Sequence, residues 1–172
     1  MKMKMICMFA ALALATSVVS AQEIPHKVKN VEVLNLNGDP CELPHFGEKN
    51  LLIFYVDPDR HKQNQDFTEE LEQNHRAASP KIYGFGVMNL KDAPMVPNGM
   101  ARNMAKKRTA KNGGLVLADE NRILSTTWGL GDCNNQFVLM VVSKEGELVF
   151  MRKGQLSDQD KADFYKFIEK YK

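Results

Sequence analysis

Two runs of six consecutive apolar residues, 51–56 (LLIFYV) and 137–142 (FVLMVV), constrain the fold of this chain more than any other feature. Each has the length of a β-strand, and a strand without polar alternation is covered on both faces. A third inner strand is predicted over residues 81–88 (KIYGFGVM). Sheets buried on both sides are typical of α/β folds, in which helices pack against each face.

The segments between these runs predict an alternating α/β chain that forms one domain. Residues 31–36 and 41–43 should form an amino-terminal hairpin around the turn NGDP. We expect helices over residues 64–77, 100–111 and 121–128, a short strand over 115–117, a hairpin strand over 147–151 and a closing helix capped by Ser157. Strands joined through helices pair in parallel, whereas the tight turn of the last hairpin makes that pair antiparallel. The prediction is a mixed central sheet flanked by helices, with Met100 and Met104 facing the core and with Ala101 and Ala105 as further candidates for the inner side of the same helix.

The first 21 residues have the pattern of a secretory signal peptide. Lys2 and Lys4 precede an apolar stretch from residue 5 to about residue 15, and residues 19–21 (VSA) suit a cleavage site. A buried or amphipathic first helix is the alternative. Cleavage near Ala21 leaves residues 22–172 as a periplasmic or otherwise secreted domain. No other stretch reaches about 18 apolar residues, so we expect no stable membrane insertion after cleavage.

The charge balance argues against nucleic acid as a partner. The full chain carries 23 Lys and Arg against 21 Asp and Glu, and loss of the two lysines of the signal peptide makes the balance even. Domains that bind nucleic acid usually show a clear basic excess. The expected partner is therefore a periplasmic protein or a small ligand, whose identity the sequence does not give.

Several motifs resemble the thioredoxin-like fold in its peroxiredoxin and secreted-thioredoxin variety. NLNGDPCEL and GEKNLLIFYV resemble its amino-terminal hairpin and first core strand, and FVLMVVSKEGELVFMRKG resembles its final hairpin. More narrowly, FYVDPD, MVPNGM, ADENRILSTTWGLGD and VVSKEG resemble the YtfJ family of small periplasmic proteins. The resemblance extends from about Val28 to Tyr171. It implies a thioredoxin-like domain with an N-terminal β-hairpin and a helical insertion, but no particular chemistry, since a fold does not dictate function.

The chain departs from this fold group at the turn where the redox cysteines belong. A thioredoxin-type enzyme needs two cysteines at the start of its first core helix, where the helix dipole stabilises a thiolate. The resemblance places these positions at Asp59 and Lys62, and it places the Thr and Cys of the peroxiredoxin pattern at Lys62 and Gln65. The proline that usually precedes the third strand is also missing near Phe137. We therefore expect neither dithiol exchange nor peroxide reduction at the usual position.

Three loops, residues 57–61, 97–99 and 131–135, are expected to meet at one end of the domain, which we call the pole. The first loop (DPDRH) brings two carboxylates and an imidazole close to a helix N-terminus. It predicts either a site for a cation, small ligand or partner, or a simple cap in which Asp59 accepts from free N–H groups. The candidate contact residues of the pole are Asp57, Asp59, Arg60, His61, Asp132, Cys133 and Asn134.

Two cysteines remain after the signal peptide, Cys41 in the hairpin and Cys133 in the third loop of the pole. An exported chain with two cysteines can hold one disulfide, but the sequence does not place their Cα atoms within the roughly 4.4–6.8 Å that this bond needs. Two unpaired thiols are the other interpretation. No base is evident near Cys133 by spacing, which argues against a nucleophilic role.

No residue spacing indicates a metal or a cofactor. The four histidines are scattered, without the H-x-x-x-H or C-x-x-C spacing of a tetrahedral site. Arg102, Lys111 and residues 106–108 (KKR) form a basic stripe on the predicted middle helix. Such a stripe is typical of a solvated helix face, with an acidic partner or a membrane surface as alternatives.

The sequence therefore favours an exported, thioredoxin-like protein that lacks the redox cysteines and serves as a non-catalytic binding or accessory module. The alternative from the enzyme class is a thiol-disulfide or peroxide-linked redox protein that uses Cys133 with Cys41 as its resolving partner. A purely structural role is the third possibility.

Overall fold

The computed structural model describes residues 22–172, so the predicted signal peptide lies outside the described residues. Its framework is a single sheet with the strand order β1-β8-β7-β4-β5-β6-β2-β3. The strands are β1 (His26–Lys27), β2 (Glu32–Leu34), β3 (Pro40–Glu42), β4 (Asn50–Val56), β5 (Ile82–Asn89), β6 (Val116–Asp119), β7 (Phe137–Val142) and β8 (Glu147–Lys153). The helices are α1 (Gln65–Asn74), α2 (Asn98–Asn112), α3 (Ile123–Thr127) and α4 (Asp158–Ile168), with 3₁₀ turns η1 (Pro58–Arg60) and η2 (Glu169–Tyr171).

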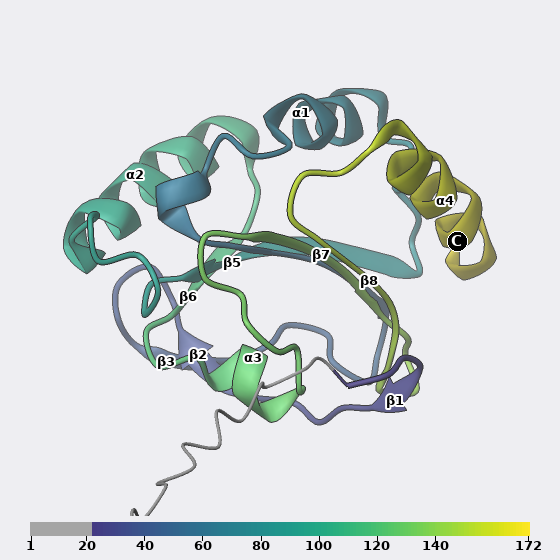
Figure 1. The fold of residues 1–172 in the computed structure, drawn as a ribbon, viewed down its shortest axis with the longest axis horizontal. Coiled ribbons are helices and arrows are strands. Elements are labelled where there is room, and N and C mark those ends of the chain that lie inside the picture. Colours follow the sequence, from purple (N-terminus) through teal and green to yellow (C-terminus); the bar gives the residue numbers. More distant parts are fainter. Residues whose placement is uncertain (1–21) are drawn as a thin grey trace, which may run out of the picture.

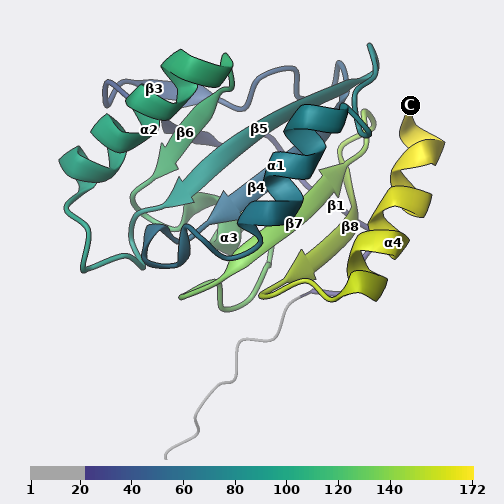
Figure 2. The ribbon, with the colours of Figure 1, turned by 90° about the horizontal axis from the view of Figure 1, so that it is seen from above.

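Helices cover both faces of the curled sheet. Figure 1 shows α1, α2 and α4 on one face, and α3 with the amino-terminal segment on the other. From above, α2, α1 and α4 follow one another across the sheet (Figure 2). The pairs β4–β5 and β5–β6 are parallel, whereas β4–β7 and β7–β8 are antiparallel. This confirms the predicted mixed sheet and its helix-joined parallel strands.

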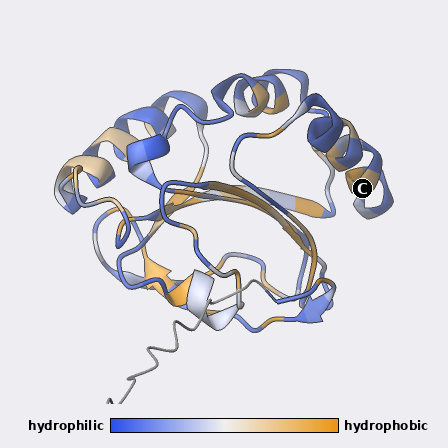
Figure 3. Cartoon of the chain, in the orientation of Figure 1, coloured by the Kyte–Doolittle hydropathy of each residue, from blue (hydrophilic) through white to orange (hydrophobic). Residues whose placement is uncertain are grey.

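The apolar runs lie at the centre of the sheet because both of their faces are buried. All six residues of β7 are buried. Its odd-numbered residues pack with α1 and α4, and its even-numbered residues pack with α3 and the amino-terminal segment. Each fully buried Val, Leu or Phe contributes about 1.5–3 kcal/mol relative to an exposed one. Figure 3 shows the result, with apolar central strands between helices that are largely hydrophilic.

The amino-terminal hairpin forms as predicted and extends one edge of the sheet. β2 pairs with β3 over three residues, and it joins β6 through Leu34 and Ala118. The Asn35 side chain closes the turn by accepting from the backbone N–H groups of Asn37 (2.8 Å) and Asp39 (3.0 Å). The opposite edge is β1, which pairs with the start of β8 and was not predicted from the sequence.

The prediction that Met100 and Met104 face the core is wrong, since their exposed fractions are 57% and 56%. Ala101 is the buried residue of α2. Its small side chain packs with Leu90 and Ala118, and this leaves the bulky methionines of the same helix on the outer side. An ion pair between Arg102 of α2 and Glu120 contributes a polar contact instead of an apolar one.

The closing helix α4 is the element that the sequence describes best. Ser157 caps it in a capping box, in which Ser157 Oγ accepts from the Asp160 N–H (3.1 Å) and Asp160 Oδ2 accepts from the Ser157 N–H (2.9 Å). Phe164 and Ile168 are fully buried against the sheet. The cap therefore fixes where the helix begins, and the apolar spacing fixes its inner face.

Candidate functional site

The parallel strands β4, β5 and β6 end at the same edge of the sheet, where the pole was predicted. A polar residue stands at or directly after the end of each strand: Asp57 after β4, Asn89 in β5 and Asp119 in β6. Ligand sites of open α/β sheets usually lie outside these carboxyl ends. The loop of residues 131–135 reaches the same edge just before β7 begins.

Asp57 joins the first and third loops of the pole. Its side chain is fully buried, and Oδ1 accepts from the Asp59 N–H at 2.9 Å. Oδ2 accepts from the Asn135 N–H at 2.7 Å. Burial raises the pKa of Asp57, and these two backbone N–H groups oppose the rise only in part. One carboxylate therefore holds together two loops that are 78 residues apart.

The prediction that Asp59 caps the helix is wrong, because Asp57 caps a preceding 3₁₀ turn and Asn64 stands at the start of the helix without a side-chain cap hydrogen bond. Asp57 has an extended backbone and caps the turn η1, which the chain inserts before α1 begins at Gln65. Asp59 lies inside η1 and is half-buried. Its Oδ1 is buried and has no hydrogen-bond donor among residues 22–172. Asn89 Oδ1, Ser143 Oγ and Tyr165 Oη share this state, but of the four atoms only that of Asp59 lies in the loops of the pole. A water molecule or a donor of a bound group can satisfy such an acceptor.

The remaining residues of the first loop face solvent. Arg60 is exposed, and its Nε donates to Asn135 Oδ1 at 3.2 Å, which adds a second contact between the two loops. His61 is exposed, with Nδ1 at 3.0 Å from the Pro58 carbonyl oxygen. In the third loop Asp132 and Asn134 are also exposed. Each of these four side chains could contact a partner without a change in the core.

Hydrogen bonds join the first and third loops of the pole, whereas the place of residues 97–99 beside them stays a prediction. Within residues 22–172, no hydrogen bond or ion pair connects residues 97–99 to either loop. This segment begins α2, and the Pro97 carbonyl accepts from the Ala101 N–H. The candidate site is therefore the surface of residues 57–61 and 131–135.

Cys133 is only 3% exposed, with Sγ at 3.6 Å from the Gly131 carbonyl oxygen. Burial raises its pKa to about 11, and Asp132 adds to the rise, although Lys153 opposes it. Catalytic thiols need the opposite shift. Cys41 lies on the edge strand β3, and burial also raises its pKa. Both cysteines are free thiols in the structure.

A second polar cluster, formed by Asn89, Asp92 and Arg122, lies behind the third loop and was not predicted. The buried Asn89 donates from Nδ2 to Asp92 Oδ2 at 2.7 Å and to the Cys133 carbonyl oxygen at 3.5 Å. Arg122 Nε donates to Asp92 Oδ1 at 2.6 Å. Burial alone would raise the pKa of Asp92, but the hydrogen bonds from Arg122 and Asn89 outweigh it and lower the value. The one feature of the sequence that could have indicated this cluster is the polar Asn89, which directly follows the predicted strand of residues 81–88.

Asp119, the last residue of β6, connects this edge of the sheet to α3. Its carboxylate accepts from the backbone N–H groups of Ile123 and Leu124, both at 2.9 Å, and so caps α3. The buried Tyr55 hydroxyl donates to the same carboxylate at 3.2 Å. Trp128, which follows α3, is buried, and its Nε1 donates to the Lys29 carbonyl at 2.8 Å. Because their polar atoms are paired, Asp119 and Trp128 have structural roles.

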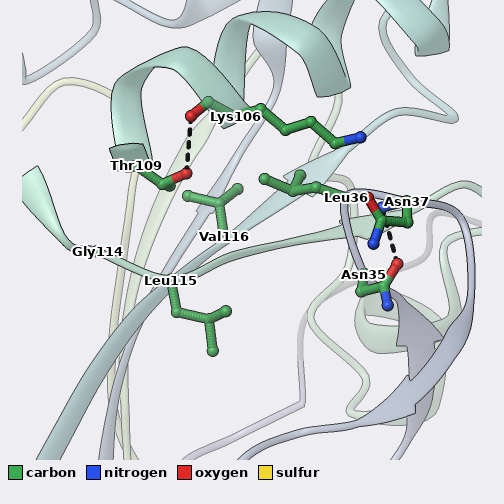
Figure 4. Close-up of a pocket in the computed structure, with 8 residues that line it drawn as sticks. All are labelled: Asn35, Leu36, Asn37, Lys106, Thr109, Gly114, Leu115 and Val116. Atoms are coloured by element: carbon green, nitrogen blue, oxygen red, sulfur yellow. Dashed lines mark hydrogen bonds between the residues drawn. The ribbon is translucent and has the colours of Figure 1, made fainter. Parts of the chain in front are cut away.

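Two hollows of the described residues are lined by segments other than residues 57–61 and 131–135. One of them, of about 340 Å³, lies between the turn of the amino-terminal hairpin and α2. Figure 4 shows Lys106 and Thr109 on one side of it, with residues 114–116 and 35–37 on the other.

Among residues 22–172, no group of three or more His, Cys, Asp or Glu is placed to hold a metal ion. In the same range, every helix falls short of the length and apolar character needed to cross a bilayer.

Comparison with known proteins identifies the fold. No protein-family model matches the chain, and no curated protein matches it in sequence. Among solved structures, it is similar to a DsbF homologue from Corynebacterium diphtheriae, with a TM-score of 0.63 and 13% identity over 94% of this chain and 98% of that one. It is also similar to a peroxiredoxin-like protein from Aquifex aeolicus, with a TM-score of 0.61 and 10% identity over 88% and 90% of the two chains.

A third similar structure is the exposed lipoprotein thioredoxin of Streptococcus pneumoniae, with a TM-score of 0.58 and 18% identity over 81% of this chain and 99% of that one. Identities this low establish the architecture and leave the chemistry open. The chain therefore has the thioredoxin-like fold.

Proposed function

We propose that this chain is an exported member of the YtfJ family, which binds a partner protein or small ligand at the pole without thiol chemistry. The signal-peptide pattern of residues 1–21 and the motifs that resemble the periplasmic YtfJ proteins support export. The similarity to an exposed lipoprotein thioredoxin is consistent with the same location.

The observation that carries this proposal is the unpaired carboxylate oxygen of Asp59. Asp57 fixes the loops on both sides of it, so the position of Asp59 is set before any ligand arrives. Buried acceptors without a donor are rare, and each unpaired one is costly. A ligand or partner that presents an N–H or O–H group would supply the missing donor. Arg60 and His61, which follow Asp59 in the sequence, are exposed and extend the polar surface.

The thiol-redox alternative has weaker support. Asp59 and Lys62 stand where the resemblance places the two redox cysteines. Cys133 is near the pole, but its burial and raised pKa make it a poor nucleophile at neutral pH.

A photocrosslinking experiment tests the binding proposal. A photoreactive benzoylphenylalanine replaces Arg60 in one variant and Gln73, exposed on α1, in a matched control. The expected result is an adduct that forms from position 60 only. The captured molecule, once purified, should bind the unlabelled protein and should lose affinity for an Asp59→Ala/His61→Ala variant. Equal capture from both positions, or unchanged affinity for the variant, would refute binding at the pole.

The absence of thiol chemistry is tested separately. The purified protein should not accelerate insulin reduction by dithiothreitol, and it should not consume hydrogen peroxide in the presence of a thiol donor. A rate that disappears in a Cys133→Ser variant would establish the redox function instead.

A further inference from the structure

The outer face of α2 carries a stripe of two methionines followed by two lysines. Met100, Met104, Lys107 and Lys111 are spaced by four, three and four residues, which places them on one side of the helix. All four are exposed. We call this set the α2 stripe. Met95, in the loop before the helix, is 83% exposed and extends the apolar end.

The opposite face of α2 is already occupied by the protein itself. On that face Arg102 pairs with Glu120. Ala101 is buried on one flank of the helix, and Arg108, which lies beside the stripe next to Met104 and Lys111, pairs with Glu72 at 3.4 Å. The helix contains no Asp or Glu. Within residues 22–172, Lys107 and Lys111 form no ion pair. The α2 stripe therefore combines exposed apolar surface with positive charge that the chain does not neutralise.

The order of residues along the stripe identifies its occupant. The apolar pair comes first and the cationic pair second, and each pair spans about one turn of the helix. A helix that lies on a membrane keeps its apolar face along its whole length, which this helix does not. Two copies of the stripe are not complementary either, because antiparallel packing sets Met against Lys and parallel packing sets Lys against Lys. An amphipathic partner helix with one apolar half and one acidic half fits both parts.

We propose that the α2 stripe docks an amphipathic helix of a partner protein, with apolar side chains on Met100 and Met104 and carboxylates on Lys107 and Lys111. Methionine suits such a contact because its flexible, polarisable side chain adapts to different apolar shapes. The two lysines set the direction of the bound helix and raise its association rate. The α2 stripe shares no residue with the candidate site of residues 57–61 and 131–135, so the inference does not depend on the proposed function.

Fluorescence anisotropy with designed peptides tests the proposal on the purified protein. Two labelled helical peptides of about 15 residues carry leucines on one half of a face and glutamates on the other half, in opposite orders. A third peptide has the same composition with the two residue types mixed along the face. One of the two segmented peptides should bind more tightly than the mixed one. Asp59→Ala/His61→Ala, at the pole, should leave this binding unchanged.

Charge reversal provides the decisive comparison. Lys107→Glu/Lys111→Glu should lower the affinity for the bound peptide at least about tenfold. A peptide with lysines in place of glutamates should bind this variant with the affinity restored. The matched control Lys144→Glu/Lys166→Glu changes the net charge equally on exposed sites elsewhere and should leave the affinity unchanged. Equal binding of all three peptides, or equal effects of the two double variants, would overturn the proposal.

Two further results would assign the stripe to another occupant and would also overturn the proposal. One is stripe-dependent binding to phosphatidylglycerol vesicles without binding to either segmented peptide. The other is a concentration-dependent dimer in sedimentation experiments that Met100→Ser/Met104→Ser abolishes.

Discussion

Replacing Asp57 with alanine should destabilise the protein and release the third loop of the pole. The carboxylate accepts two backbone hydrogen bonds, at 2.7 Å from Asn135 and 2.9 Å from Asp59. A hydrogen bond to a charged acceptor is worth about 1.5–3 kcal/mol, so the two together supply about 3–6 kcal/mol. Burial of the carboxylate, which raises its pKa, offsets part of this sum, and the exposed Asn135 can turn its N–H to water. We expect a net loss of about 2–3 kcal/mol.

Urea unfolding measures this loss. At an unchanged m-value of about 1–3 kcal/mol/M, the loss lowers the midpoint by about 0.7–3 M. Asp66→Ala, an exposed acid on α1, is the matched control and should stay within about 0.5 kcal/mol of the parent protein. Native-state hydrogen exchange gives a local readout, since the Asn135 amide should exchange faster in Asp57→Ala. The reasoning fails if Asp57→Ala matches the stability of Asp66→Ala, or if the Asn135 amide keeps its protection.

Three further predictions concern single side chains. Asn64→Ala should lower the free energy of unfolding by about 2–4 kcal/mol, because the buried Asn64 side chain accepts from the Leu156 N–H and donates to the Gly154 carbonyl, both at 2.8 Å. Urea unfolding measures this loss, with the exposed Asn74→Ala as the control. Iodoacetamide at pH 8 should modify Cys133 only upon unfolding, since its pKa is raised to about 11, and mass spectrometry of native and denatured samples would expose an error if native protein reacted at Cys133. Because the pKa of Asp57 is raised above its ordinary value of 3.8, the native state binds this proton more tightly than the unfolded chain does. The contribution of this group to the unfolding free energy should therefore fall as the pH rises from about 3.8 through the raised pKa of the native state. A pH series on Asp57→Asn, which does not titrate, should lack this fall.

The central strands and the closing helix could be predicted because each has a local signal. Residues 51–56 and 137–142 are apolar throughout, and only a strand covered on both faces has this pattern at this length. Ser157 and Asp160 mark the start of α4 through a capping box that needs no distant contact. The approximate position of the pole also follows from the sequence, because loops after parallel strands meet at one edge.

The remaining features depend on contacts between distant segments. Asp57, and not Asp59, is the capping residue, because a 3₁₀ turn that begins at Pro58 precedes α1. The second hydrogen bond of its carboxylate comes from Asn135 in the third loop. The direction of Met100 could not be read from periodicity, since α2 has small residues on one side and methionines on the other. The contact of Asn89 with Asp92 becomes meaningful only once Arg122, 30 residues away, is seen to complete it.

The strand order also bears on how this chain resists aggregation. β7 and β4, whose uninterrupted apolar sequences are the segments best suited to cross-β assembly, occupy the third and fourth places from one side of the sheet. The two outermost strands are the least able to recruit another chain, since β1 has two residues and β3 has three and begins with Pro40, which lacks an N–H to donate. Fraying at the edge leaves β7 covered until both β1 and β8 have detached. The hazardous segments are therefore exposed only late in unfolding, and early in folding their exposure ends once β8 has closed over β7.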